Sequence, residues 1–223
     1  MTTCAEIRLI GGFTLVLPSG QTTVAESLQR LLAFLALRGP TPRTALAGTL
    51  WPGTCDERSM ASLRTAVWRL RRLAPGLLVR TPGTLELSPG ARIDVTRLAE
   101  FAGPAWPNLL PGWYDDWVLM ERERLRHRYL RMLEASATTA LDSGQPAVAL
   151  DRALAAAAAD PLRESAHRLV IRALLADGNL AAARRHLGLV RVLFREHLGV
   201  APTEQLTDLF RPMEAVQPMQ PVA

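Results

Sequence analysis

The segment 63–73, LRTAVWRLRRL, constrains this chain more than any other, because its residues separate by type when they are placed on a helix. Leu63, Val67 and Leu70 fall on one stripe, with Ala66 beside them. The remaining sides carry arginine, threonine and tryptophan: Arg64, Thr65, Trp68, Arg69, Arg71 and Arg72. Arginine can bond bidentately to guanine or phosphate, and threonine or an aromatic edge can contact a thymine methyl group. Alone, the pattern fits a DNA-reading helix and an ordinary helix with a solvated basic face equally well.

The preceding segments help to decide between these two interpretations. Short strands are predicted within 5–24, where apolar residues alternate, followed by helices over 25–37 and 42–50. A polar loop, 52–58, leads to Ser59, which we expect to cap the arginine-rich helix. The arginine-rich segment is therefore predicted to be the third helix of the N-terminal part.

A short hairpin follows this third helix. Strands are predicted over 77–80 and 84–87 about a Thr81-Pro82-Gly83 turn, which places Arg80 near the tip. Strands, three helices and then a hairpin are the order of a winged helix. In that fold the third helix enters the major groove, and the hairpin, or wing, lies against an adjacent groove or the DNA backbone. Residues 1–100 are therefore predicted to form a winged helix-turn-helix domain.

The distribution of charge agrees with this prediction. All 26 basic residues are arginine, and alanine, glycine and proline are abundant, which indicates a GC-rich coding bias. Arginine content alone therefore says little about function. Residues 1–98, however, hold 12 arginines against 6 acidic residues, whereas residues 113–211 hold 14 against 13. A positive surplus in the N-terminal part is expected if that part meets a polyanion.

The C-terminal half is predicted to be a separate helical domain. A proline- and glycine-rich linker spans 101–112, helices fill 113–210, and 211–223 is expected to be a disordered tail. Exposed ion pairs are expected on the first of these helices, between Glu121 and Arg124 and between Glu123 and Arg126. The helices are expected over 117–141, 146–159, from 160 onward, 180–197 and 203–210.

An internal repeat specifies the type of helical domain. Three small residues recur with an offset of 34: Gly144, Ala147 and Ala149 return as Gly178, Ala181 and Ala183. This offset is the period of tetratricopeptide repeats, in which small residues lie where paired helices approach closely. The predicted fold class is therefore mainly α with a small β component, a winged helix followed by an all-α tetratricopeptide-like domain.

No group of residues supports an enzyme. The chain has no lysine, which excludes a P-loop, and it has neither a G-x-S-x-G elbow nor a nucleophile with an evident base. The four histidines lack the spacing of metal ligands, so we expect no cofactor and no metal. Asp115 and Asp116, which lie among aromatic residues, are expected to begin a helix rather than to form a catalytic pair.

The chain is also predicted to be a soluble cytoplasmic protein without a membrane partner. It shows no signal peptide, and its longest apolar run, 31–37, is too short to span a bilayer. Cys4 and Cys55 belong to no ligand cluster and are expected to be free thiols in a reducing compartment.

Longer motifs resemble a known family. The segment LWPGTCDERSMASLRTAVWRLRR resembles the OmpR-type winged helix of the Streptomyces antibiotic regulatory proteins. The segments LLPGWYDDWVLMERERLRHRYLRMLE, DPLRESAHRLVIRALLADGN and FREHLGVAPT resemble their bacterial transcriptional activation domain. The resemblance covers about residues 5–210. It implies a nucleoid-associated activator that binds direct repeats in promoter DNA as a dimer. By the same resemblance it recruits RNA polymerase through the sigma or alpha subunit and regulates specialised metabolism.

The resemblance also implies roles for particular segments. It makes 62–73 the recognition helix, 78–87 the wing, and 52–59 the turn that faces the polymerase. Two positions depart from the family pattern: Trp68 replaces a small polar residue, and Gly83-Thr84 replaces a Gly-Tyr step. The candidate DNA contacts are Arg64, Thr65, Trp68, Arg69, Arg71, Arg72, Arg80 and Arg43. The candidate polymerase-contact loop consists of Gly53, Thr54, Asp56, Glu57 and Arg58.

Several alternatives stay open. Trp68 either contacts a sugar or a thymine methyl group or packs on a neighbouring helix, and Arg43 either touches the DNA backbone or is an ordinary surface residue. Many arginine contacts to phosphate position a protein without reading sequence. The same fold also suits a repressor or an architectural DNA-binding protein. A different class of protein, a tetratricopeptide scaffold that binds a peptide and has a vestigial winged helix, fits the pattern as well.

Overall fold

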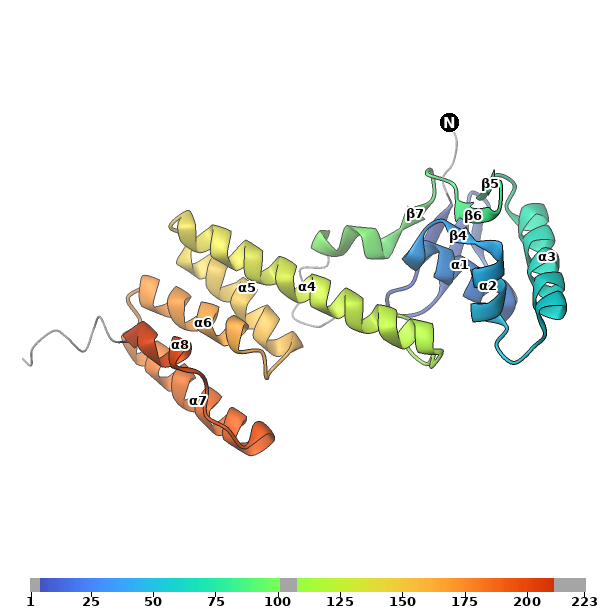
Figure 1. Ribbon diagram of the computed structural model, residues 1–223. Coiled ribbons are helices and arrows are strands. Elements are labelled where there is room, and N and C mark those ends of the chain that lie inside the picture. Colours follow the sequence, from blue (N-terminus) through green and yellow to red (C-terminus); the bar gives the residue numbers. More distant parts are fainter. Residues whose placement is uncertain (1–4, 101–107, 211–223) are drawn as a thin grey trace, which may run out of the picture. The chain divides into compact units, whose positions relative to one another are not determined.

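The computed structural model describes residues 5–100 and 108–210, except for the side chains of Arg80 and residues 98–100 (Figure 1). The described residues form two compact units, one of residues 5–100 with 108–125 and the other of residues 126–210. Within the described ranges, no helix is long and apolar enough to cross a membrane.

The first unit begins with a four-stranded sheet. Its strands in spatial order are β3 (Gly20–Thr22), β2 (Thr14–Leu17), β1 (Glu6–Arg8) and β7 (Arg92–Ile93). Ile7 in β1 pairs with Leu15 of antiparallel β2 and with Ile93 of parallel β7. The 3-10 helix η1 (Asp94–Glu100) follows β7. The Asp94 carboxylate accepts hydrogen bonds from the backbone nitrogens of Leu9 (2.8 Å) and Ile10 (2.9 Å). Strand β7, which sequence patterns did not predict, and Asp94 after it thereby hold the end of the winged-helix segment against its first strand.

The order of helices and wing agrees with the predicted winged helix. Helices α1 (Glu26–Arg38), α2 (Arg43–Leu50) and α3 (Asp56–Leu73) precede the wing strands β5 (Leu78–Thr81) and β6 (Thr84–Leu87). The wing turns at Pro82-Gly83, where Gly83 has a φ of 75° that suits glycine. The unpredicted strand β4 (Thr41–Pro42) pairs with β6 and makes the wing three-stranded.

Residues beyond the winged helix also belong to the first unit. Leu109 forms a β-bridge with Ile10, so part of the predicted linker pairs with the N-terminal strands. Helix α4 (Asp116–Asp142) then begins against α1, where the rings of Phe34 and Trp117 lie 5.1 Å apart. This compact unit is therefore larger than the predicted domain of residues 1–100.

Ion pairs reinforce the contact between α1 and the start of α4. Arg30 pairs with Asp115 and Arg38 pairs with Glu121. Glu121 is only 5% exposed, so its predicted place on an exposed face is wrong, although Arg124 still lies 3.6 Å from it. The local spacing of Glu121 and Arg124 gave no sign of Arg38, because that partner lies on another helix.

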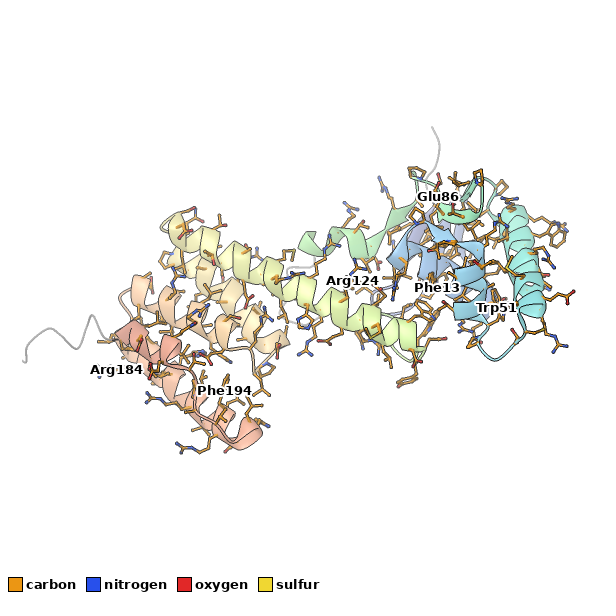
Figure 2. The ribbon with its side chains drawn as sticks, in the orientation of Figure 1. Phe13, Trp51, Glu86, Arg124, Arg184 and Phe194 are labelled. Atoms are coloured by element: carbon orange, nitrogen blue, oxygen red, sulfur yellow. The ribbon has the colours of Figure 1, made fainter. Side chains whose placement is uncertain are left out.

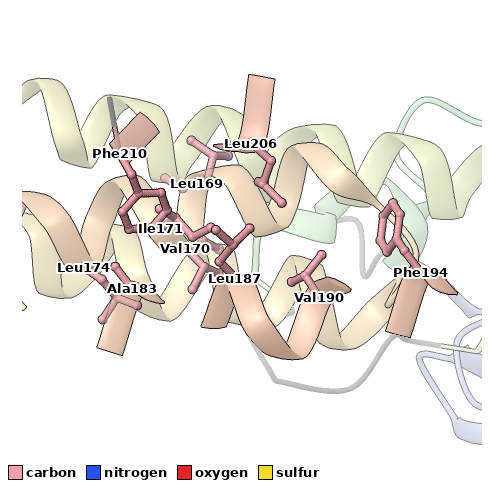
Figure 3. Close-up of a cluster of buried hydrophobic side chains, with 12 residues drawn as sticks. Leu169, Val170, Ile171, Leu174, Ala183, Leu187, Val190, Phe194, Leu206 and Phe210 are labelled. Atoms are coloured by element: carbon pink, nitrogen blue, oxygen red, sulfur yellow. The ribbon is translucent and has the colours of Figure 1, made fainter. Parts of the chain in front are cut away.

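The second unit contains the end of α4 and a set of paired helices. These are α5 (Pro146–Ala159), α6 (Glu164–Ala176), α7 (Leu180–Leu198), α8 (Glu204–Thr207) and the 3-10 helix η2 (Asp208–Phe210). Apolar residues of α6 and α7 form the largest part of one buried cluster together with Leu206 and Phe210, which close its C-terminal side (Figure 3). The helix predicted to start at Asp160-Pro161 begins instead at Glu164, after a turn.

The turns before α5 and α7 repeat with the predicted offset. Gln145 donates to the Ala140 carbonyl, and 34 residues later Asn179 donates to the Leu174 carbonyl, both at 2.8 Å. Ala149 and Ala183, which follow these turns, are fully buried and allow the helices to approach closely. Ala147 and Ala181 are exposed, so they do not lie in the helix contact.

A carboxylate connects α4 with the start of α6. Glu134 accepts hydrogen bonds from Arg163 Nε (2.7 Å) and Nη2 (2.8 Å), and also from the Ser165 hydroxyl. Burial raises the pKa of Glu134, but the hydrogen bonds from Arg163 and Ser165 outweigh it and hold that pKa below the ordinary 4.5. The charged carboxylate therefore stabilises the second unit.

Two histidines that are distant in sequence also meet in this unit. His167 Nδ1 of α6 lies 3.1 Å from His186 Nε2 of α7, and His167 Nε2 lies 2.8 Å from the Pro161 carbonyl oxygen. A carbonyl only accepts, so Nε2 of His167 carries the proton and its Nδ1 accepts from His186. Burial, with the neighbouring His167, lowers the pKa of His186 to about 4. Among the described residues, no group of three or more potential ligands surrounds this pair or forms elsewhere.

Replacing Glu134 tests the connection between α4 and α6. Glu134→Gln should lower the free energy of unfolding at pH 7 by about 1–2 kcal/mol, because the charged hydrogen bonds weaken. The folded-state pKa of Glu134 is lowered, so this stabilisation is present above the ordinary pKa and is lost as pH falls through the folded-state value. Urea unfolding measures the change. The exposed Asp151→Asn should have little effect, and equal losses in both variants would contradict the prediction.

The histidine pair predicts a pH dependence of stability. The pKa of His186 is about 4 in the folded chain and 6.5 ordinarily, so the unfolded chain binds more protons between these values. The free energy of unfolding should therefore fall as pH decreases from 6.5 towards 4. His186→Gln should reduce this slope in urea unfolding, whereas His197→Gln, on the exposed end of α7, should leave it unchanged. Identical slopes in wild type and His186→Gln would rule out this origin.

Candidate nucleic-acid interface

Helix α3 separates apolar and basic residues as its sequence predicts. Leu63, Ala66, Val67 and Leu70 are buried in the first unit. The other side is exposed and carries all six predicted contact residues of this helix: Arg64, Thr65, Trp68, Arg69, Arg71 and Arg72. The burial of one stripe fixes the orientation of α3, so the basic side chains point into solvent.

The basic side chains of α3 are available for binding. Within the described ranges, Arg64, Arg69 and Arg71 have no ion-pair or hydrogen-bond partner in the chain. Like charges so close together repel one another and do not stabilise a helix. A guanidinium without an internal partner keeps all its donors for phosphate or for a base edge. The exposed face of α3 is therefore suited to a polyanion.

The predicted start of α3 is wrong. The helix begins at Asp56 after the N-cap residue Cys55, and Ser59 lies inside it, where its hydroxyl donates to the Asp56 carbonyl (2.9 Å). Asp56 and Glu57 favour the first turn because acidic groups interact well with a helix N-terminus. Of the predicted polymerase-contact loop, only Gly53 and Thr54 lie outside the helix, while Asp56, Glu57 and Arg58 form its first turn. All five residues are exposed.

Trp68 lies at the centre of the exposed face. Its side chain is 57% exposed, so it does not pack on a neighbouring helix. The Arg72 guanidinium lies 4.9 Å from the centre of its ring, one helical turn further on. This cation–π contact holds two of the predicted DNA-contacting side chains together.

A polar groove beside α3 was not predicted. Arg58, Ser62, Thr65 and Arg69 follow one another at spacings of four, three and four residues along one side of the helix. Ser27, near the start of α1, and Trp51, after α2, also line the groove, together with Ala61 and Ala66 of α3. Figure 2 labels Trp51 at this edge of the unit. Hydroxyl groups next to two guanidinium groups are typical of a site that binds a DNA backbone phosphate. If the helix had been predicted to begin at Asp56, its periodicity would have placed Arg58, Ser62, Thr65 and Arg69 on one side.

The wing lies next to the start of α2. The backbone nitrogen of Arg43 donates to the Gly83 carbonyl (3.1 Å), and Arg43 is half-buried beside Thr81 and Pro82. Arg80 belongs to β5 opposite Leu85, but its side chain lies outside the described part of the structure. Arg43, the first residue of α2, therefore lies at the wing turn.

Known proteins are similar to this chain in sequence. Residues 90–213 match the family model of the bacterial transcriptional activator domain. The chain is 32% identical to regulatory protein AfsR of Streptomyces coelicolor, over 85% of this chain and 22% of that protein. It is 29% identical to AfsR of Streptomyces griseus, over 80% of this chain and 21% of that protein. The chain thus spans about a fifth of the length of these curated relatives.

A solved structure has a similar fold. Mycobacterium tuberculosis EmbR, in complex with a low-affinity phosphopeptide, superposes with a TM-score of 0.77 over 98% of this chain and 67% of that chain, at 19% identity. With the matched activator domain and the AfsR relatives, the classification is clear. The chain belongs to the bacterial transcriptional activator domain family and is of the Streptomyces antibiotic regulatory protein type.

Proposed function

We propose that this chain binds promoter DNA through α3 and the wing and activates transcription by recruiting RNA polymerase. The observation that carries the proposal is the exposed face of α3, where arginines without internal partners surround Thr65 and Trp68 on a winged helix. In such a fold the third helix enters the major groove. Membership of the activator domain family supports activation rather than repression.

The contacts divide between base readout and positioning. Trp68 and Arg72 lie towards the centre of the exposed face and Arg64 on its flank, and these three residues are proposed to meet base edges, sugars or thymine methyl groups. The groove that contains Arg58 and Arg69 is proposed to hold a backbone phosphate. Arg43 and Arg80, at the wing, are proposed to contact an adjacent phosphate or the minor groove.

The remaining roles follow from the family. The segment from Gly53 to Arg58 is exposed and includes the first turn of α3, where it can meet the sigma or alpha subunit of a polymerase bound next to the site. Binding as a homodimer to direct repeats, action on specialised-metabolism genes in the cytoplasm, and an association with the nucleoid belong to this proposal. Lower rather than higher transcription from a reporter that carries the retained DNA would make the chain a repressor.

Removing two arginines from α3 tests DNA binding. We first select the DNA fragments that the full chain retains and then measure their affinity for Arg64→Ala/Arg69→Ala. The loss should be at least about a hundredfold at moderate salt, because two charged contacts disappear. The salt dependence of binding should also become shallower, since fewer counterions are released.

The matched control is Arg128→Ala/Arg131→Ala, which removes the same charge from an exposed part of α4. It should retain nearly full affinity. Unchanged binding by the α3 variant would contradict the proposed DNA interface. A flat salt response of the wild type would do the same.

Trp68 is predicted to determine sequence preference. Trp68→Ser restores the small polar residue usual in the family and removes the ring that stacks on Arg72. We expect a changed consensus in a selection from random duplexes, with phosphate-based affinity for unrelated DNA nearly unchanged. An unchanged consensus would show that Trp68 does not read DNA.

A further inference from the structure

Helix α7 carries aliphatic residues on the side opposite its core. Its buried stripe, Ala183, Leu187, Val190 and Phe194, packs into the second unit. About half a turn away, Leu189 and Val192 lie one turn apart, with exposed fractions of 69% and 53%. A surface helix that faces only water would be polar on that side. These two side chains form a small exposed apolar area that a partner could cover.

A basic stripe runs beside these aliphatic residues. Arg184, Arg191 and Arg195 are exposed, and among the described residues they have no ion-pair or hydrogen-bond partner (Figure 2 labels Arg184). Two arginines elsewhere in the unit are paired, Arg163 with Glu134 and Arg126 with Asp160. The helix dipole favours a cation in the last turn, where Arg195 lies. The dipole does not account for Arg184 and Arg191. Arg191 and Arg195 are four residues apart on the helix and therefore repel one another.

Gly188 lies in the middle of the same stripe. Glycine inside a helix costs about 1 kcal/mol relative to alanine. A Cβ atom at this position would meet no other atom within 4 Å, so packing within the chain does not require glycine here. The missing side chain leaves room for the backbone of another molecule to approach α7 between Arg184 and Arg191.

We propose that this surface of α7, formed by Arg184, Gly188, Arg191, Arg195, Leu189 and Val192, binds an acidic amphipathic helix of a partner protein. The partner's carboxylates would pair with the arginines, its apolar side would cover Leu189 and Val192, and its backbone would cross at Gly188. A nucleic-acid backbone fits less well, because phosphates leave the two aliphatic side chains in water. The inference adds a partner to the proposed function and uses none of the α3 contacts.

The test uses the full chain and a synthetic peptide. The probe is a fluorescent helix of about five turns with glutamates along one stripe and leucines along the next, and its counterpart has lysine in place of glutamate. Fluorescence anisotropy at low ionic strength should show saturable binding of the acidic peptide with Kd on the order of 10 μM, and no binding of the basic one. Absence of binding to the wild-type chain would overturn the proposal.

Gly188→Glu separates binding from folding. It places a negative charge inside the basic stripe and fills the crossing point, so the acidic peptide should bind at least about tenfold more weakly. The variant's Tm should not fall, because glutamate is a better helix former than glycine and the position is open. Arg184→Ala/Arg191→Ala should weaken the binding of the acidic peptide to a similar degree.

Two controls complete the test. Ala135→Glu, an equal charge change at an exposed position of α4, should leave peptide binding intact, and an equal loss there would overturn the assignment to α7. Retention of unrelated duplex DNA is measured with the same variants. If Gly188→Glu weakened the retention of DNA but not the binding of peptide, the surface would be a nucleic-acid site and the proposal would be wrong. Promoter binding by α3 should not change in any α7 variant, so failure of one proposal leaves the other standing.

Discussion

The burial of α1 on several sides is the constraint on which the first unit depends. Residues 31–35 are all buried, which is impossible for a helix that covers a core with one face only. The described structure covers α1 with β1 and β6, with α3, and with the start of α4. Helix α3 packs against both α1 and α2, so the position of the basic face depends in part on α1, which contributes only Ser27 to the lining of the groove beside α3. Arg30 and Arg38, on the polar edge of α1, bind the carboxylates that lie at the start of α4.

The amino-acid sequence was sufficient for features that depend on local periodicity. Helices α1, α2, α5 and α7 have the predicted bounds to within one residue, and Leu63, Val67 and Leu70 are buried as expected. Helix spacing shows which residues share a face, and the turn at Pro82-Gly83 has the residues that a hairpin needs. The exposed arginines of α3 were identified in the same way.

The features that local patterns missed depend on residues far apart in the chain. Strands β4 and β7 have two residues each, too few for a pattern, and form only because partners from distant segments lie beside them. Glu121 was placed with Arg124 by spacing, although Arg38 is the partner that buries it. The groove beside α3 was missed for a local reason: Asp56 and Glu57 were interpreted as polar loop residues, although acidic residues also favour a helix start. The contact between His167 and His186 could not be predicted without knowing that α6 packs against α7.

The division of α4 between the two units bears on how this kind of protein can be recombined. A chimera joined at the proline- and glycine-rich segment 101–112 would give the N-terminal unit a foreign start of α4 to cover α1. Phe34 would lose Trp117, and Arg38 would lose the carboxylate of Glu121. A junction after Leu125 keeps these partners together. Segments that exchange as modules, in the laboratory or between genes, are therefore expected to end inside the helix rather than at the proline- and glycine-rich sequence before it.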